Sequence, residues 1–523
     1  MEPPTRGFSA AQELSSTAVI LNTVRILSLS FLILACSVAS GQDFDEFVID
    51  AGFRVEQRVL VADLHGDSSR EILVAGRDEV HEQHLAIYSL ASIRETGAEP
   101  LITLNPGGNL IAYDVGRLGD DDALLFIEPG RVLRYSIEDG DFVEFIKIRS
   151  IYGQQRSGDI LPIDFFRDID GDGLDDLIVQ DTAGYRIRLQ KPDGSLGEES
   201  LLEESSRMTV TGGVVSFESR PLFSGDTNFD GVTDLGVWRG NTLRVYPQLP
   251  GHRYQGKPDI VQLGLDLLSE AEFRALEAAA GSVDQRGLSQ KIIVSIEDHN
   301  GDNLPDILIE STMSMGVFDK RNTLSLHLGR RQGESLIYDE AEDALLASEG
   351  LQYGMVTTDI DGDGLQDLVV RKVRLSFSRV IRALVSGNVS LRLSFFRMTP
   401  DGGYSEEPNY VTRTKVHFSM ASGQIDIPAV AVADFDGDGL KDLVIQTRSD
   451  RLSLSRGVAD EILFSDESTD IEVVLPRNGD LVASEDVDGD GRSDLVMRYT
   501  AADGEQAAHI VRLLIASPMS SGK

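Results

Sequence analysis

The stretch Asp359-Ile-Asp-Gly-Asp-Gly-Leu-Gln-Asp367 decides how the rest of the chain is read. The same pattern of acidic positions returns at seven further points, two of which, starting at Asp63 and Asp114, are degenerate copies. The five well-preserved further copies start at Asp168, Asp226, Asp298, Asp434 and Asp486. Successive copies start 51 to 75 residues apart. A repeat near this period predicts a stacked or circular array of one supersecondary unit.

The chemistry of the nine-residue phrase favours a hard metal ion. Carboxylates at positions 1, 3, 5 and 9 of a tight loop can converge on one point, together with the backbone carbonyl of position 7. Such an all-oxygen set suits Ca²⁺ and offers no nitrogen or sulfur to zinc or copper. Without a cation, carboxylates about 4 Å apart would repel by ~1–4 kcal/mol per pair. A run of acidic β-turns is the alternative interpretation, but recurrence in fixed register favours metal loops.

The sixth residue of the phrase is predicted to adopt a left-handed backbone conformation. Position 6 is glycine or asparagine in seven of the eight copies, with Ser68 as the exception. These residues are the ones that a left-handed backbone position selects. The ninth-position Asp replaces the twelfth-position Glu of an EF-hand, and no helical pattern flanks the loop, so the phrase is not an EF-hand.

We therefore expect about six Ca²⁺ sites, one in each well-preserved copy. The expected ligands, at positions 1, 3, 5, 7 and 9, are Asp168, Asp170, Asp172, Leu174, Asp176, Asp226, Asn228, Asp230, Val232, Asp234, Asp298, Asn300, Asp302, Leu304, Asp306, Asp359, Asp361, Asp363, Leu365, Asp367, Asp434, Asp436, Asp438, Leu440, Asp442, Asp486, Asp488, Asp490, Arg492 and Asp494.

The degenerate copies differ in what they can bind. The first has His65 at position 3 and Glu71 at position 9, which leaves open whether it holds an ion. The second has Gly116 and Leu118 at ligand positions and is expected not to bind.

These motifs resemble the FG-GAP/VCBS-type repeat of integrin-α-like β-propellers and of many secreted bacterial propellers. The resemblance covers nearly the whole chain after residue 41, and the Asp-x-Asp-Gly-Asp-Gly-x-x-Asp motif is specific to this kind of loop. The Phe-Gly and Gly-Ala-Pro signatures of the integrin version are not evident, so the bacterial type fits better. The resemblance implies one four-stranded blade per repeat, with the calcium loop joining two strands of the blade.

Short apolar strands at this spacing predict an all-β fold, and the repeat length favours a single β-propeller over residues 42–516, followed by a short tail at 517–523. The C-terminal repeat supplies three strands, one short of a blade. The segment Phe44–Ile49 reads as an isolated strand that could complete it. The count favours eight blades closed by the N-terminal strand, with seven blades as the alternative.

Residues 1–41 read as a secretory signal, because Ile26–Ala39 is an apolar run too short to span a bilayer comfortably. Cleavage near Ala39 or Gly41 would suit ordinary signal peptidase. The alternative is a loose lipobox that would leave Cys36 as a lipid-anchored N-terminus. Cys36 is the only cysteine, so the exported domain has no disulfide. We expect a secreted, periplasmic or cell-surface protein with no transmembrane span after signal removal.

The chain carries a formal net charge of −38, part of which belongs to the expected metal loops. Nucleic acid is therefore not expected as a partner. Within this acidic chain, residues 371–397 hold seven basic residues and no acid. We interpret this basic insertion as an added hairpin that either binds an anionic glycan, lipid head group or acidic partner, or packs on the acidic rim of its own propeller. A second insertion at 269–281 begins with a capping box and predicts a short surface helix.

Other candidate sites are weaker. His81 and His84 read as part of a solvated loop and Trp238 as a packing residue. No nucleophile elbow, phosphate loop, dinucleotide fingerprint or cysteine-based site is present. The first hypothesis for function is a non-enzymatic, calcium-stabilised binding or adhesion platform. The alternative is a carbohydrate-active enzyme, since some polysaccharide lyases with calcium loops resemble eight-bladed propellers, and fold alone does not decide between the two.

Overall fold

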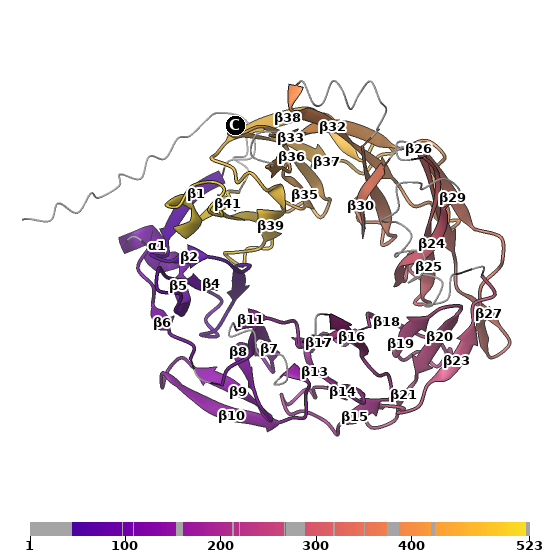
Figure 1. The fold of residues 1–523 in the computed structure, drawn as a ribbon, viewed down its shortest axis with the longest axis horizontal. Coiled ribbons are helices and arrows are strands. Elements are labelled where there is room, and N and C mark those ends of the chain that lie inside the picture. The colour runs from indigo at the N-terminus through magenta and orange to yellow at the C-terminus, as the bar shows by residue number, and fades with distance from the viewer. Residues whose placement is uncertain are drawn as a thin grey trace, which may run out of the picture. The chain divides into compact units, whose positions relative to one another are not determined.

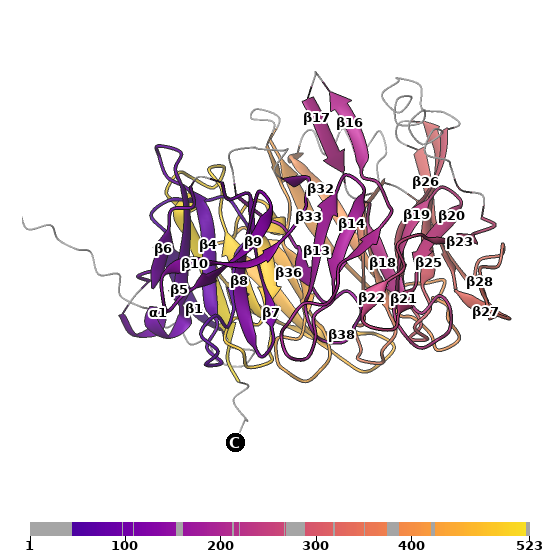
Figure 2. The same ribbon diagram turned by 90° about the horizontal axis from the view of Figure 1, so that it is seen from below.

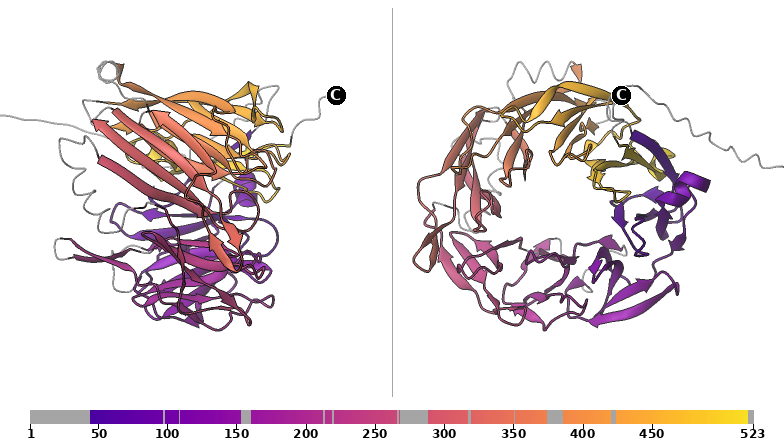
Figure 3. Two further views of the ribbon diagram at one scale, coloured as in Figure 1. Left: turned by 90° about the vertical axis from the view of Figure 1, so that its right-hand side faces the viewer. Right: turned by 180° about the vertical axis from the view of Figure 1, so that it is seen from behind.

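The computed structural model describes residues 44–518 except 97, 108, 153–159, 212–213, 219, 266, 268–287, 317–318, 350, 374–385 and 420–423. Within this part of the chain, eight sheets of four or five strands follow one another around a ring, and all their strand pairs are antiparallel except the short parallel pair of β7 and β11 (Figure 1). The fold is therefore an eight-bladed β-propeller, as predicted. The same ring is seen from behind in Figure 3.

The blades use the strands in chain order. Blade 1 contains β2 (Arg54–Val55), β3 (Leu60–Ala62), β4 (Glu71–Arg77), β5 (Gln83–Ser89) and β6 (Ile102–Leu104). Blade 2 contains β7 (Ala112–Leu118), β8 (Asp121–Glu128), β9 (Arg131–Ser136), β10 (Asp141–Lys147) and the short β11 (Leu161–Pro162). Blade 3 contains β12 (Phe166–Arg167), β13 (Asp176–Asp181), β14 (Gly184–Arg188) and β15 (Ser200–Leu202). Blade 4 contains β18 (Leu222–Gly225), β19 (Asp234–Arg239), β20 (Thr242–Tyr246) and β23 (Asp259–Gln262).

The second half of the ring repeats this order with longer strands. Blade 5 contains β24 (Leu288–Glu297), β25 (Asp306–Gly316), β26 (Asp319–His327) and β29 (Ala344–Glu349). Blade 6 contains β30 (Leu351–Thr358), β31 (Asp367–Val373), β32 (Asn388–Phe396), β33 (Tyr410–Phe418) and β34 (Ile425–Asp426). Blade 7 contains β35 (Val430–Ala433), β36 (Asp442–Arg448), β37 (Arg451–Gly457) and β38 (Phe464–Glu472). Blade 8 contains β39 (Val482–Glu485), β40 (Asp494–Arg498), β41 (Ile510–Ala516) and β1 (Phe44–Asp50).

The ring closes through its first and last strands. β1 pairs antiparallel with β41 along its full length, from Phe44 opposite Ala516 to Asp50 opposite Ile510. The N-terminal strand thus supplies the fourth strand of blade 8, which confirms the predicted clasp and the count of eight. Because the two ends of the domain share one sheet, opening the ring requires breaking this ladder.

The core lies between the blades. Successive residues of a strand point to opposite faces of its sheet, so each apolar second strand contacts both neighbouring blades. On β31, Leu368 packs with Leu308 of blade 5, whereas the next residue, Val369, packs with Leu443 of blade 7. This two-sided burial explains why the second strand of each blade is almost continuously apolar, and it supplies most of the hydrophobic stabilisation.

Among the described residues, three short hairpins and one α-helix lie outside the eight blade sheets. The hairpins are β16–β17 (Arg207–Thr211, Val214–Glu218), β21–β22 (Gln248–Leu249, Arg253–Tyr254) and β27–β28 (Arg330–Gln332, Ser335–Ile337). The β16–β17 hairpin extends beyond the neighbouring strands β13 and β14 on one face of the ring (Figure 2). The helix α1 (Leu90–Thr96) packs against β5 and β1. None of the described helices is long and apolar enough to span a bilayer.

The prediction for residues 371–397 needs a correction. Arg371 and Lys372 lie on β31 and Arg392 lies on β32, which are the second and third strands of blade 6. The described parts of this segment are therefore regular blade strands and not an added hairpin, because alternation of the kind seen at 388–396 is also what an ordinary blade strand requires. Residues 374–385 and the predicted helix at 269–281 lie outside the described residues.

Candidate metal centres

The acidic phrases join the first and second strands of their blades. In seven of the eight phrases the residue before position 1 pairs with position 9, as with Thr358 and Asp367 in blade 6. The same closing pair occurs in blades 1, 3, 4, 5, 7 and 8. In blade 2, by contrast, β7 and β8 pair from Ala112 to Leu118 across a short turn, so Asp114–Asp122 forms no such loop. The second copy therefore lacks the loop geometry that the other copies share.

Position 6 adopts positive φ in all eight copies, between 65° at Asn303 and 91° at Gly439, which confirms the predicted left-handed position. This conformation turns two backbone N–H groups toward the carboxylate of position 1. In the blade 6 loop, the Gly362 N–H donates to Asp359 Oδ1 (2.8 Å) and the Gly364 N–H donates to Oδ2 (3.0 Å). The position 1 side chain is therefore held in the middle of the loop before any ion binds.

Position 9 ties the loop to the third strand. Asp367 is fully buried, and its carboxylate accepts hydrogen bonds from the Ile360 N–H (3.0 Å) and from the Met398 N–H (2.8 Å) just after β32. The position 9 aspartates of blades 3, 5, 7 and 8 are buried and bonded in the same way, namely Asp176, Asp306, Asp442 and Asp494. The orientation of this carboxylate is thus fixed from two directions.

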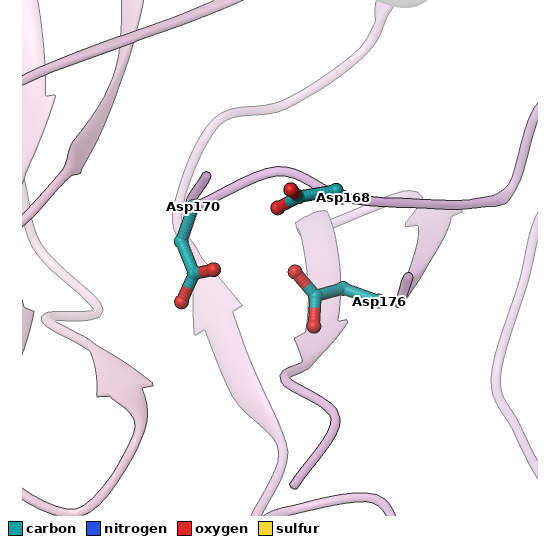
Figure 4. A group of neighbouring side chains, drawn as sticks. All are labelled: Asp168, Asp170 and Asp176. Carbon is teal, nitrogen blue, oxygen red and sulfur yellow. The ribbon is translucent and has the colours of Figure 1, made fainter. Parts of the chain in front are cut away.

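Four loops bring three carboxylates together. Oxygen atoms of positions 1, 3 and 9 lie within 4.8 Å of one another in the loops that start at Asp168, Asp359, Asp434 and Asp486. Figure 4 shows the carboxylates of Asp168, Asp170 and Asp176 gathered on one side of the blade 3 loop. These are the four loops in which the sequence places four carboxylates.

Several oxygens in these groups are buried without a hydrogen-bond partner. They include Oδ1 of Asp170, Asp361 and Asp488, all at position 3. A buried carboxylate oxygen that accepts no hydrogen bond is costly. A hard cation with oxygen ligands would satisfy it, so the residues present fit Ca²⁺.

The other predicted ligands are placed differently. The position 5 aspartates of these four loops are exposed and lie outside the three-carboxylate groups; Asp363 Oδ1, for example, accepts from the Leu365 N–H (3.0 Å). The position 7 residues are half-buried beside them. The loops with Asn228 and Asn300 keep the same backbone bonds to Asp226 and Asp298 but offer no three-carboxylate group among the residues described.

The first loop has a histidine and a glutamate at two of the ligand positions. His65 Nδ1 lies 3.0 Å from Glu71 Oε1, and Glu71 Oε2 accepts from the Leu64 N–H (2.9 Å). The Ser68 N–H of position 6 donates to Asp63 Oδ2 (2.8 Å), as in the blade 6 loop, but the second donor to Asp63 is the Asp67 N–H of position 5 (3.1 Å). The imidazole of His65, at position 3, thus contacts the position 9 carboxylate directly.

Sequence reasoning missed the groups that contact position 3 from outside the loop. Gln248 Nε2 donates to Asp170 Oδ2 (2.8 Å), and the guanidinium of Arg397 contacts both Asp361 and Asp363. Asp488 is contacted in the same way by Arg94 of α1 at 3.4 Å. These partners are distant in sequence or lie on another blade, so no sequence motif predicts these contacts.

Neighbouring loops are also joined to each other. The Gln366 N–H of the blade 6 loop donates to the His299 carbonyl of the blade 5 loop (2.9 Å), and the Lys441 N–H of the blade 7 loop donates to the Ile360 carbonyl (2.8 Å). The candidate sites therefore form part of one hydrogen-bonded series along the rim of the ring.

Burial makes the position 9 carboxylates hard to ionise in the absence of metal. Desolvation raises the pKa of Asp176, Asp306, Asp367 and Asp494 to about 7 and that of Asp442 to about 6. The backbone hydrogen bonds lower each pKa, but less than burial raises it. These groups therefore hold protons near neutrality unless a cation replaces them.

We expect the metal-free protein to lose stability as pH rises. Because these pKa values are raised from about 4 in the unfolded chain to about 7 in the folded one, the folded state binds more protons between pH ~4 and ~7, and unfolding becomes easier across that window. Calcium binds the deprotonated carboxylates and should remove or reverse this trend. Melting temperatures from about pH 5 to pH 8, with chelator and with calcium, test the prediction; a metal-free protein that gains stability over this range would contradict it.

The eight-bladed ring places the chain in the class of β-propellers. It is similar to the Dos1 propeller, with 10% identity over 92% of this chain and 96% of that one and a TM-score of 0.39. It is also similar to the V. cholerae biofilm matrix protein Bap1, with 12% identity over 88% of this chain and 77% of that one and a TM-score of 0.26. A third similar structure is the exotype rhamnogalacturonan lyase YesX, with 12% identity over 91% of this chain and 73% of that one and a TM-score of 0.23. No protein-family model and no curated protein matches the chain. These likenesses concern the fold alone.

Proposed function

We propose that the protein is an exported, calcium-stabilised β-propeller that serves as a non-enzymatic binding or adhesion platform. The observation that carries this proposal is the fourfold recurrence of three carboxylates within 4.8 Å of one another, with buried position 3 oxygens left unpartnered in three of the four loops. This arrangement is what a set of structural calcium loops of the FG-GAP/VCBS type requires.

The role of calcium in this proposal is structural. Asp359, Asp361 and Asp367 would hold the ion in blade 6, and the matching residues would do so in blades 3, 7 and 8. A bound ion would neutralise the crowded carboxylates and tie the first strand of the blade to the second and third. Outside the cell, sites with dissociation constants of ~10⁻⁴–10⁻³ M are filled at millimolar calcium, which suits permanent structural sites. Export through the signal at residues 1–41 is consistent with that role.

The proposed partner is anionic. Of the basic residues between 371 and 397, Arg397 is engaged by the blade 6 calcium loop and so is not available to an external partner. A surface for an acidic glycan or protein would have to be built from other cations of blade 6 and its neighbours.

A panel of polyuronates separates a platform from an enzyme. A lyase would generate unsaturated products, so absorbance of these products would rise with time in the presence of calcium-loaded protein. We expect no increase above the protein-free control for any member of the panel. Steady product formation, abolished by boiling the protein, would replace the platform hypothesis with the carbohydrate-active enzyme considered above.

A further inference from the structure

Two adjoining cavities open where blades 6, 7 and 8 meet. Their volumes are about 470 and 100 Å³, and they share His417, Asp426 and Arg477 in their walls. The smaller cavity is also lined by Lys415 and Arg448. Four basic residues thus surround the opening, and Asp426 is the only acid among its described lining residues.

The cations of this opening differ from most arginines of the ring. Arg397, Arg451 and Arg512 each contact a carboxylate, as is usual in so acidic a chain. The cationic side chains of Lys415, Arg448 and Arg477 are exposed and make no ion pair with any described residue. A cluster of unpaired positive charge inside a chain of net charge −38 creates a local field that attracts anions.

The opening lies on the face opposite the calcium loops. In blade 6, Phe396 pairs with Leu368 beside the calcium loop, whereas Asn388 at the other end of β32 pairs with His417. Arg448 ends β36, whose first residue is the calcium-loop residue Asp442. The cation cluster is therefore separated from the candidate metal sites by the length of a blade strand.

The walls of the opening are held in place by hydrogen bonds between blades. The Thr414 hydroxyl donates to the Gln446 carbonyl (2.8 Å), and the Gln446 side chain accepts from the Ala429 N–H (2.9 Å). The Gly479 N–H donates to the Ile427 carbonyl (2.7 Å). Rigid walls reduce the entropy that a ligand would lose on ordering them.

One acceptor in the opening has no donor. Asp426 Oδ1 is buried and accepts no hydrogen bond. A free oxyanion such as sulfate has no donor to offer it, whereas a sugar hydroxyl does. A ligand that satisfies both the cations and Asp426 must combine a negative charge with hydroxyl groups.

We propose that this opening is a binding site for an acidic saccharide, which names the partner class of the platform proposed above and rests on that proposal. The sugar carboxylate would pair with Arg448, Arg477 and Lys415 through charge-assisted hydrogen bonds. Its hydroxyls would donate to Asp426 and exchange hydrogen bonds with Thr447 and Ser449. The apolar edge formed by Leu475 and Pro476 would contact the sugar ring.

Binding is tested by calorimetry with calcium-saturated full-length protein. The probes are a glucuronate-containing oligosaccharide and the same oligosaccharide with its carboxylates reduced to alcohols. We expect binding of the acidic form only, weakened roughly tenfold by Arg477→Gln and by Lys415→Gln. Arg253→Gln, at an exposed arginine of β22 without an ion pair among the described residues, is the matched control and should bind as the unchanged protein does.

Every outcome is decisive for the site. Equal binding of the two oligosaccharides, or binding unaffected by both pocket variants, would overturn the proposal. If inorganic sulfate competes as strongly as the oligosaccharide binds, the site takes a simple oxyanion and the saccharide assignment is wrong. Failure here leaves the calcium hypothesis standing, because that hypothesis is measured separately by metal content and by melting temperature.

Discussion

Chelation of calcium is expected to lower the melting temperature of the folded protein by roughly 5–10 °C. At free calcium tenfold above the dissociation constant, one site adds about 1.4 kcal/mol to the free energy of unfolding, and six such sites add ~8 kcal/mol. For a domain of this length the entropy of unfolding corresponds to roughly 1 kcal/mol per degree. The loss should be fully reversed when calcium is added back.

Magnesium is the matched control for this experiment. It demands near-octahedral geometry at shorter distances and gives up its water reluctantly, so equal magnesium should stabilise the chelated protein much less. Equal stabilisation by both ions would indicate general charge screening of an acidic protein instead of site binding. A melting temperature that does not respond to chelation would contradict the structural role proposed for the loops.

The substitution Asp367→Ala is expected to cost about 2–5 kcal/mol of folding stability even in the absence of calcium. It removes the acceptor of two backbone N–H groups, those of Ile360 and Met398, at a position with no solvent exposure. Each buried donor left without a partner costs about 1–3 kcal/mol. Denaturant unfolding of the metal-free variant measures the effect.

Asp361→Asn provides the matched comparison in the same loop. Asp361 contributes an unpartnered oxygen and a contact to Arg397 but holds no backbone N–H of the loop closure. Its substitution should change the free energy of unfolding of the metal-free protein little. It should reduce the stabilisation by calcium by the contribution of one site. If Asp367→Ala proved as mild as Asp361→Asn without calcium, the account of position 9 as a structural clamp would be wrong.

The sequence predicts the ring and its closure well because both depend on local, repeated signals. Each copy of the phrase, with the apolar strand that follows it, specifies one blade. The C-terminal repeat has only three strands, which identifies β1 as the missing fourth strand. Position 6 is predictable as left-handed because only a few residue types adopt that conformation readily, and even Ser68 adopts it here.

The sequence predicts the candidate sites less completely because their neighbours come from distant segments. The spacing of aspartates does not show that Asp363 accepts a hydrogen bond from the Leu365 N–H, since this bond depends on the conformation of the loop. It cannot place Arg397 beside Asp361, because the direction of a side chain after a strand depends on tertiary packing. The sequence also does not predict the cation-lined opening, because its lining residues come from three separate segments of the chain.

Counting the calcium ions bound per chain, by native mass spectrometry of the full-length protein and of Asp361→Asn, tests the central claim most directly. The account predicts about six ions, with four held most firmly in the loops of blades 3, 6, 7 and 8, and one ion fewer in the variant. A chain that binds no calcium, or a variant that binds as many ions as the unchanged protein, would contradict it.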